Sequence, residues 1–302
     1  MSQVLAIDIG GTKVALALAD TGHLAGPRVV RFDTPADGPA ALSRIVLEGR
    51  ALVGAGKAIP VGVSFGGHVD GERVHSLHVP GWDDAGLVPT LRAAFGGPVR
   101  VANDAEAGAL AERAARADDG VRDLVYVTVS TGVGAAVVAA GRIVRGSHGL
   151  AGEIGHMKVA DSGLCSCGGT GHVEAVASGT AISLRAAHEA LGVRGAGAPT
   201  ARAVAQAAEA GDLTARRILA EAGDALGRAL AMAALCVDPE VICLGGGVSG
   251  AGEAFWGPLR RAVDAGTLRP VAVERARRGP DAALAGALLL AADPTLTPDC
   301  VG

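Results

Sequence analysis

Residues 4–26 read VLAIDIGGTKVALALADTGHLAG, and this stretch decides the fold. Apolar residues run over 4–9 and resume over 14–18, a pattern that predicts two strands joined by a glycine turn. Residues 124–146, LVYVTVSTGVGAAVVAAGRIVRG, repeat this order of strand, glycine turn and strand about 120 positions further along. Any two hairpins share some likeness, but the repeat favours two domains that begin with the same hairpin.

The segments outside the two hairpins alternate between strand-like and helix-like patterns. Residues 59–65 (IPVGVSF) and 98–104 (PVRVAND) read as strands, whereas 39–55 has apolar residues at a helical period and 105–117 is rich in alanine. Further helices are expected over 175–192, 200–210 and 212–236. Strands that alternate with helices predict an α/β fold.

The composition and charge of the chain narrow its class. With 302 residues, of which 49% are hydrophobic and 19% charged, the chain can fill one large or two medium-sized domains and is not of a disordered type. The net charge of -4 argues against a nucleic-acid-binding surface, which needs a basic face. We find neither a signal peptide nor the roughly 18 consecutive apolar residues of a membrane span. The cysteine pattern is not a disulfide framework, so we expect a cytoplasmic protein. From the charge and the apolar runs, we expect that it binds neither nucleic acid nor membranes.

The turn of the first hairpin, DIGGTK from Asp8 to Lys13, has the chemistry of an anion site. Glycines let backbone N–H groups approach a phosphate closely, and Thr12 and Lys13 add a hydroxyl and a positive charge. Asp8, at the end of a buried strand, can hold Mg²⁺ through water. The alternative is an ordinary type I′ or II′ hairpin turn, and the chain holds no GxxxxGK[ST] P-loop. The second turn, STGVG at 130–134, favours the phosphate interpretation, because two such turns across a cleft can clamp a polyphosphate.

A polar pair, Asn103 and Asp104, ends the strand at 98–104. Asp104 as a mere helix N-cap is the simple alternative, but it leaves the adjacent Asn103 unexplained. At the carboxyl edge of a parallel sheet, such a pair lies where α/β proteins bind ligands. A carboxylate there suits a general base that takes the proton from a sugar hydroxyl.

A cluster of soft metal ligands lies in the glycine-rich stretch 152–174. One residue separates Cys165 from Cys167, and His156 and His172 flank the pair. Four such ligands suit tetrahedral zinc, and they leave no open position for a catalytic metal. Two free thiols and two surface histidines are the alternative. We expect a structural zinc site.

A third glycine loop, LGGGVSG at 244–250, matches GxGxxG. A dinucleotide site would need an acidic residue about 20 positions later, at the end of a second strand. Asp264 comes too early for that role, and 254–262 reads as a helix. We therefore expect the loop to contact an adenosine, not a dinucleotide.

The motifs DIGGTK, VAND, VSTGVG, GEIGH, CxCGGxGxxE and GGG, in this order, resemble the ROK family of bacterial sugar kinases and repressors over essentially the whole chain. The resemblance implies a two-domain actin/hexokinase-like ATPase fold, an α/β fold of duplicated RNase H-like lobes with the active site in the interdomain cleft. We expect a small lobe at 1–115, closed by a C-terminal helix at about 288–302, and a large lobe at 116–287. Because DIGGTK begins at Asp8, no room is expected for the helix-turn-helix domain of the repressors, so the kinase branch is implied.

The resemblance also implies a role for each matching residue. Asp104 is the expected catalytic base, which takes the proton from the sugar hydroxyl. The expected sugar-binding residues, besides Asp104, are Gly66, Gly67, Asn103, Glu153, His156 and Glu174. The expected ATP and Mg²⁺ positions are Asp8, Gly10, Gly11, Thr12, Lys13, Thr131, Gly132, Gly246 and Gly247. The chemistry is in-line phosphoryl transfer, in which positioning and magnesium neutralise charge on the γ-phosphoryl group.

The chain departs from the family's zinc pattern at one ligand. His156, Cys165 and Cys167 match the pattern, whereas His172 stands where the family has a third cysteine, so we expect a Cys₂His₂ site. His156 would then serve twice, with one ring nitrogen on zinc and the other facing a sugar hydroxyl. His68, where proline is common, and His78, where asparagine is frequent, are further departures that leave the exact hexose open.

We therefore expect an ATP:hexose 6-phosphotransferase that prefers glucose and works as a homodimer or homotetramer with Mg²⁺ and structural Zn²⁺. Kinases of N-acetylmannosamine or another N-acetylhexosamine, or of fructose, are the alternatives within the family. A sugar sensor without catalysis is the alternative of another class, but it would have no need of a base at Asp104. Whether polyphosphate can replace ATP is not visible in the sequence.

Overall fold

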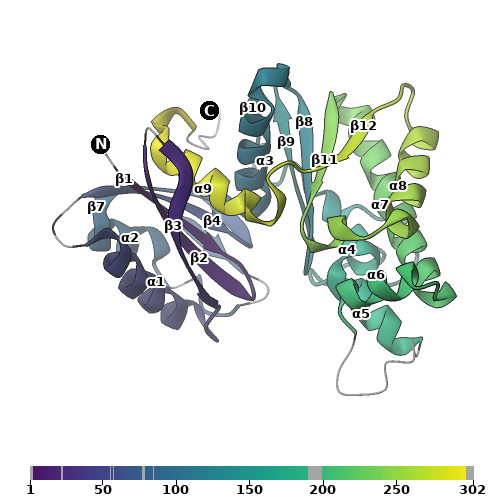
Figure 1. The fold of residues 1–302 in the computed structure, drawn as a ribbon, viewed down its shortest axis with the longest axis horizontal. Coiled ribbons are helices and arrows are strands. Elements are labelled where there is room, and N and C mark those ends of the chain that lie inside the picture. Colours follow the sequence, from purple (N-terminus) through teal and green to yellow (C-terminus); the bar gives the residue numbers. More distant parts are fainter. Residues whose placement is uncertain are drawn as a thin grey trace. The chain divides into compact units, whose positions relative to one another are not determined.

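The computed structural model describes residues 3–21, 23–54, 56, 58–76, 79–83, 85–189 and 199–296. The chain forms two compact units: unit 1 comprises 1–114, 145–151 and 281–302, and unit 2 comprises 115–144 and 152–280. The short segment 145–151 thus belongs to unit 1, although its chain neighbours on both sides belong to unit 2. Each unit is built around its own sheet (Figure 1).

Unit 1 contains a five-stranded sheet with the strand order β3-β2-β1-β4-β7. β1, β4 and β7 are parallel to one another, whereas β2 is antiparallel to both β1 and β3. The elements of this unit are β1 (Gln3–Ile9), β2 (Lys13–Asp20), β3 (His23–Asp33), α1 (Gly38–Val53), β4 (Ile59–Phe65), β5 (His68–Asp70), β6 (Arg73–His75), α2 (Leu87–Phe95), β7 (Gly96–Asn103), α3 (Asp104–Ala115), α9 (Ala282–Ala292) and η5 (Pro294–Leu296).

Different helices cover the two faces of this sheet, because side chains alternate along each strand. Leu5 and Ile7 of β1 belong to a core shared with α1 and α2, whereas Val4 and Ala6 belong to a core shared with α9. In Figure 1, α1 and α2 lie on one face of the sheet and α9 on the other. By the same alternation, Asp8 points to the α9 face, which explains why its carboxyl group is desolvated.

The terminal helix differs in its bounds from the one expected at about 288–302. α9 begins at Ala282 and ends at Ala292, and Pro294 follows immediately after its C-cap. Proline disfavours the helical conformation of the residue before it, which ends the helix there. Gly62 of β4 lets α9 pack closely on the sheet, because a Cβ at that position would lie 2.0 Å from the Ala287 carbonyl oxygen. Residues 297–302 lie outside the described part of the chain.

Unit 2 repeats the sheet of unit 1, with the strand order β10-β9-β8-β11-β12. β8, β11 and β12 are parallel, and β9 is antiparallel to both β8 and β10. The duplication that the two hairpins predicted is therefore confirmed at the level of strand order and direction. The elements are η1 (Ala117–Asp119), β8 (Leu124–Val129), β9 (Val133–Ala139), β10 (Arg142–Val144), η2 (Ile154–His156), α4 (Val173–Ala177), α5 (Gly179–His188), α6 (Ala201–Glu209), α7 (Leu213–Val237), β11 (Val241–Gly245), η3 (Gly247–Gly250), α8 (Glu253–Gly266), β12 (Ala272–Arg275) and η4 (Gly279–Asp281).

The helix expected over 175–192 is interrupted in unit 2. Ser178 ends α4 and caps α5, because its hydroxyl accepts a hydrogen bond of 3.0 Å from the Ala181 N–H. Alternate residues of β8, namely Val125, Val127 and Val129, pack in the core with α7 and α8. None of the helices in the described residues has both the length and the apolar character of a membrane span.

Candidate active site

Three predicted site segments of unit 1 meet at one edge of its sheet. Ile9, Phe65 and Asn103 end the parallel strands β1, β4 and β7, and they pair in register. The turns beyond them are joined by two hydrogen bonds of 2.8 Å, from the Gly66 N–H to the Ile9 carbonyl and from Asn103 Nδ2 to the Gly67 carbonyl. The carboxyl edge of parallel strands is where α/β sheets bind ligands.

The turn after β1 is not one of the primed hairpin turns. Type I′ and II′ turns need positive φ angles in their central residues, and Gly10, Gly11 and Thr12 have none. Thr34 holds the turn from outside: its hydroxyl donates to the Gly10 carbonyl at 2.7 Å, and its N–H donates to the Thr12 carbonyl at 3.0 Å. The glycines are thus not needed for an unusual φ, and a turn without side chains is compatible with the close approach of a ligand to the backbone. Gly10 has a steric reason as well, since a Cβ there would lie 3.1 Å from the Lys13 carbonyl oxygen.

Asp8 lies on β1, shortly before this turn. Ser64, its cross-strand neighbour on β4, donates a hydrogen bond of 2.8 Å to Asp8 Oδ1. Burial raises the pKa of Asp8 to about 6, although the Ser64 hydrogen bond lowers it; the charge of Asp281 raises it further and that of Arg31 lowers it. At neutral pH Asp8 is an anion, and an enclosed carboxylate beside a glycine turn suits a hydrated Mg²⁺.

Asn103 caps helix α3, and Asp104 occupies the first position of that helix. Asn103 Oδ1 accepts from the Ala105 N–H at 2.8 Å, and Glu106 Oε2 accepts from the Asn103 N–H at 3.1 Å. This reciprocal pair is a capping box. Asp104 Oδ1 also accepts from the Ala105 N–H at 2.8 Å. The capping role that the simple alternative gave to Asp104 thus belongs chiefly to Asn103, and it fixes the Asp104 backbone at the sheet edge.

The corresponding turn of unit 2 is one residue shorter and is tied to helix α5. Three residues separate the last pair of β8 and β9, whereas four separate the last pair of β1 and β2. The Gly179 N–H donates to the Ser130 carbonyl at 2.7 Å, and the Thr180 N–H donates to the Thr131 carbonyl at 3.4 Å. The predicted phosphate turn therefore lies against the N-terminal end of α5.

Glu174 connects this turn with the cysteine loop. Its Oε2 accepts from the Val133 N–H at 3.0 Å, and its Oε1 accepts from the Ser166 hydroxyl at 2.5 Å. Gly132 makes this approach possible, because a Cβ there would lie 2.4 Å from Glu174 Oε2. Burial raises the pKa of Glu174, but hydrogen bonds from Ser166, Val133 and Cys165 outweigh it and hold the pKa below its ordinary value. Glu174 is therefore an anion at neutral pH.

A cavity of about 740 Å³ lies in unit 2 at the carboxyl edge of β8 and β11. This volume is in the range of small-molecule ligand sites. Ser130, Thr131, Gly179, Thr180, Ser183, Leu184, Thr200, Ala201, Arg202, Ala205, Leu219, Gly247, Val248, Gly250 and Ala251 line it.

Two of the four nucleotide positions predicted in unit 2, Thr131 and Gly247, line this cavity, and Gly132 and Gly246 do not. Gly246 has a φ of 79°, and a Cβ there would lie 2.4 Å from the Val129 carbonyl oxygen. The backbone conformation and the close packing against β8 therefore require glycine at this position. The wall formed by α5 and α6 was not predicted from the sequence, because its polar residues are spread along the chain without a characteristic spacing.

The four predicted metal ligands, His156, Cys165, Cys167 and His172, come together in unit 2. Their ligand atoms all lie within 4.8 Å of one another. Cys165 Sγ is 3.6 Å from His156 Nδ1, and Cys167 Sγ is 3.3 Å from His172 Nδ1. Tetrahedral zinc, with bonds of about 2.3 Å to sulfur and about 2.0 Å to nitrogen, separates such ligands by about 3.5 Å. The donor set and its spacing therefore fit zinc.

The two ring nitrogens of His156 face different groups. Nδ1 faces Cys165, and Nε2 lies 3.6 Å from Glu153 Oε2. A metal bound through Nδ1 would leave Nε2 for Glu153 or for a sugar hydroxyl, the arrangement that a double role requires. Gly169 lets the loop fold back, because a Cβ there would lie 2.2 Å from His172 Cε1.

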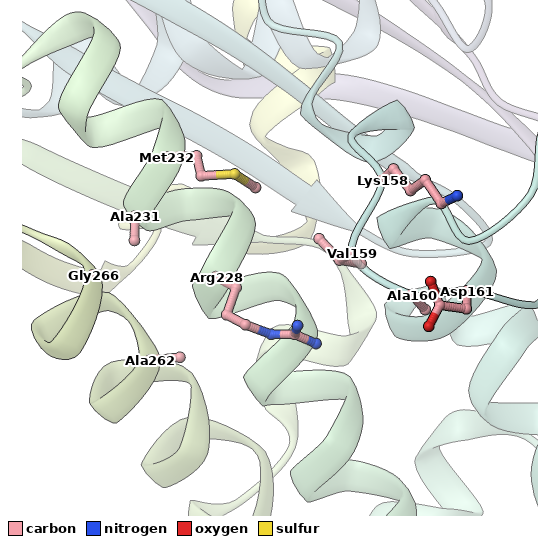
Figure 2. A pocket seen from close by; sticks show the side chains of 9 residues that line it. All are labelled: Lys158, Val159, Ala160, Asp161, Arg228, Ala231, Met232, Ala262 and Gly266. Carbon is pink, nitrogen blue, oxygen red and sulfur yellow. The ribbon is translucent and has the colours of Figure 1, made fainter.

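A second cavity of unit 2, of about 660 Å³, lies beside the cysteine loop. Figure 2 shows Arg228 and Met232 of α7 on one side of it and the segment 158–161 on the other. This segment is bound to the chain that carries His172, through hydrogen bonds from the Val159 and Ala160 N–H groups to the Gly171 carbonyl. The lining of this second cavity contains charges of both signs, so the cavity favours no class of ligand.

Two further residues that the sequence analysis singled out lie on strands of unit 1. Lys13 is exposed at the start of β2, and His68 begins β5, where it pairs with His75 of β6. His78 lies outside the described residues.

The chain matches the ROK family over residues 4–294. It is 35% identical over 290 residues to a glucokinase of Halalkalibacterium halodurans, covering 88% of this chain and 86% of the relative. It is also 35% identical over 303 residues to an N-acetylmannosamine kinase of Salmonella typhimurium, covering 97% of this chain and 99% of the relative. The structure of a ROK family glucokinase from Streptomyces griseus, in complex with glucose and AMPPNP, matches with a TM-score of 0.81 and 30% identity, covering 96% of this chain and 99% of that one.

Proposed function

The chain belongs to the ROK family and has the actin/hexokinase-like fold of its sugar kinases, and we propose that it transfers the γ-phosphoryl group of ATP to the 6-hydroxyl of a hexose, preferentially glucose. The observation that carries this proposal is the capped Asn103–Asp104 turn at the carboxyl edge of β1, β4 and β7. A sugar sensor without catalysis would have no need of a rigidly placed carboxylate there. The Streptomyces griseus glucokinase in complex with glucose and AMPPNP supports both substrates.

In this proposal Asp104 accepts the proton of the sugar hydroxyl as that oxygen attacks the γ-phosphorus. Asn103 is held by its bonds to Gly67 and Ala105, so the sugar meets a rigid surface. In unit 2, Glu153, His156 and Glu174 would bind further sugar hydroxyls. Placing a nucleophile and a base in a fixed geometry lowers the entropic part of the barrier.

The glycine turns and the cavity of about 740 Å³ would bind the nucleotide. The turns at 10–12 and 130–132 offer backbone N–H groups to phosphate oxygens. Asp8 would hold a hydrated Mg²⁺, which neutralises the charge on the transferring phosphoryl group when it is bound. The cavity, with Thr131 and Gly247 in its wall, would take the adenosine.

We further propose that His156, Cys165, Cys167 and His172 bind one structural Zn²⁺. Their spacing and donor types support this assignment. When bound, the metal would hold the loop together and fix the tautomer of His156 whose Nε2 faces Glu153. The expected homo-oligomer and cytoplasmic location stay predictions.

N-acetylmannosamine is the second candidate substrate, because the Salmonella typhimurium relative that carries this name matches at the same identity over a larger share of the chain. Release of ADP from ATP with a panel of glucose, mannose, fructose, N-acetylglucosamine and N-acetylmannosamine tests both candidates. Glucose should give the highest kcat/KM. A higher value for N-acetylmannosamine would reassign the substrate, and no sugar-dependent release with any member would contradict the kinase function.

A further inference from the structure

We propose that Arg145 is a positioning residue that holds the Asn103–Asp104 turn in its active geometry. This inference rests on the proposed sugar kinase function, in which Asp104 is the base. In this proposal Arg145 acts through Glu106, which it contacts directly.

The contact between Arg145 and Glu106 is short and enclosed. An Arg145 guanidinium nitrogen donates to Glu106 Oε2 at 2.6 Å, and the two side chains are only 12% and 14% exposed. The same Oε2 accepts the Asn103 N–H at 3.1 Å. One carboxylate oxygen thus joins the guanidinium to the backbone of the residue before Asp104.

The capping box alone explains Glu106, but not the presence of Arg145. Removing one partner of an enclosed ion pair leaves the other charge poorly solvated, and that charge then turns toward water. Without Arg145, the Glu106 carboxylate would therefore no longer be held in the position where it accepts the Asn103 N–H. Freed at its backbone, Asn103 would hold Gly67 and Ala105 less firmly, and the Asp104 carboxylate would shift with it.

The segment that carries Arg145 is itself fixed to unit 1. Residues 145–151 form a closed loop, in which the Ala151 N–H donates to the Arg145 carbonyl at 3.0 Å. Gly149, with a φ of +69°, passes close to β5, since a Cβ there would lie 3.6 Å from the Val69 carbonyl oxygen. Immediately beyond this loop, the chain continues to Glu153 in unit 2. A single short stretch of chain therefore carries both the support of the proposed base and a proposed sugar ligand.

Arg145→Met, Arg145→Lys and Glu106→Gln test the inference through kinetics with glucose and ATP. A displacement of about 1 Å can cost about 100-fold in rate, so Arg145→Met should lower kcat about 10- to 100-fold and raise the KM for glucose, with little change in the KM for ATP. Arg145→Lys should recover part of the loss. The double variant Arg145→Met/Glu106→Gln should be no worse than the poorer single variant, because both changes break one interaction.

Arg92→Met is the matched control, because Arg92 of the same unit also pairs with a glutamate, Glu72 at 2.5 Å, but in an exposed position. It should leave both kcat and KM nearly unchanged. Equal kinetics of Arg145→Met and wild type, or losses that multiply in the double variant, would overturn the positioning role.

Hydrogen exchange separates this inference from the proposed function. The Asn103 and Ala105 amides should exchange faster in Arg145→Met than in wild type, and Arg92→Met should leave them as protected as in wild type. A wild-type protein that phosphorylates no sugar, with this exchange result, would contradict the function but leave the positioning intact. Unchanged protection in Arg145→Met would contradict the positioning whatever the activity.

Discussion

Replacing Asp8 with asparagine should remove a pH-dependent loss of stability between about pH 5 and about pH 7.5, and it should also remove ATP-dependent activity. Burial holds the folded-state pKa of Asp8 at about 6, against its ordinary value of 3.8. The folded state therefore binds this proton more tightly than the unfolded state does. The group favours folding at acid pH and costs stability progressively as the pH rises from about 3.8 through about 6, above which the cost is constant.

The difference between these pKa values corresponds to about 3 kcal/mol at neutral pH, and solvent at the accessible edge of Asp8 reduces that figure. An asparagine has its own fixed cost, because its amide hydrogens need acceptors in the same site. That cost does not change with pH. The free energy of unfolding of wild type, relative to Asp8→Asn, should therefore fall by up to about 1.4 kcal/mol between about pH 5 and about pH 7.5.

Urea-induced unfolding at constant ionic strength across this pH range measures the difference. Asp70→Asn, which removes an exposed carboxylate of the same unit, controls for the loss of one negative charge. A difference between wild type and Asp8→Asn that stays constant over the range would refute the burial of a charge at Asp8. Unchanged kcat and unchanged Mg²⁺ dependence in Asp8→Asn would separately remove Asp8 from the phosphate site.

Two further substitutions examine unit 2. His172→Ala should reduce bound zinc, measured by metal analysis, from about one per chain to a small fraction. His172→Cys should retain the zinc, and so should His188→Ala, a control at an exposed position. A metal-free wild type with full activity would contradict the zinc site. Gly132→Ala should push Glu174 away from the Val133 N–H. The KM for glucose should then rise about 10- to 100-fold, since a hydrogen bond to a charged group contributes about 1.5–3 kcal/mol. An unchanged KM in steady-state kinetics would show that Glu174 has no part in sugar binding.

The two sheets were predictable where their strands are buried and regular. The hairpins 4–20 and 124–139 were predicted from apolar runs on either side of a glycine turn. Their repetition indicated that the two sheets would have the same strand order. β3 was missed because Gly26 and Pro27 interrupt its sequence, a pattern that argues against a central strand. β3 lies at the edge of its sheet, where a proline is tolerated.

The site residues divide in the same way between local and tertiary signals. The proposed zinc ligands were predicted because they lie close together in sequence, and the structure brings their ligand atoms within 4.8 Å of one another. The capping role of Glu106 was not recognised, although its spacing from Asn103 is that of a capping box. Ser64 and Arg145 had no local signal: Ser64 meets Asp8 through the pairing of β1 with β4, and Arg145 reaches Glu106 only because 145–151 packs on unit 1.

The most direct test of the central claim is glucose-dependent ADP release by Asp104→Asn, with glucose binding measured in parallel by calorimetry. The substitution preserves the shape of the side chain and removes its ability to accept a proton. We predict a loss in kcat of about 10²- to 10⁴-fold with glucose affinity nearly retained. A variant whose kcat stays within about threefold of wild type would contradict the role of Asp104 as the base.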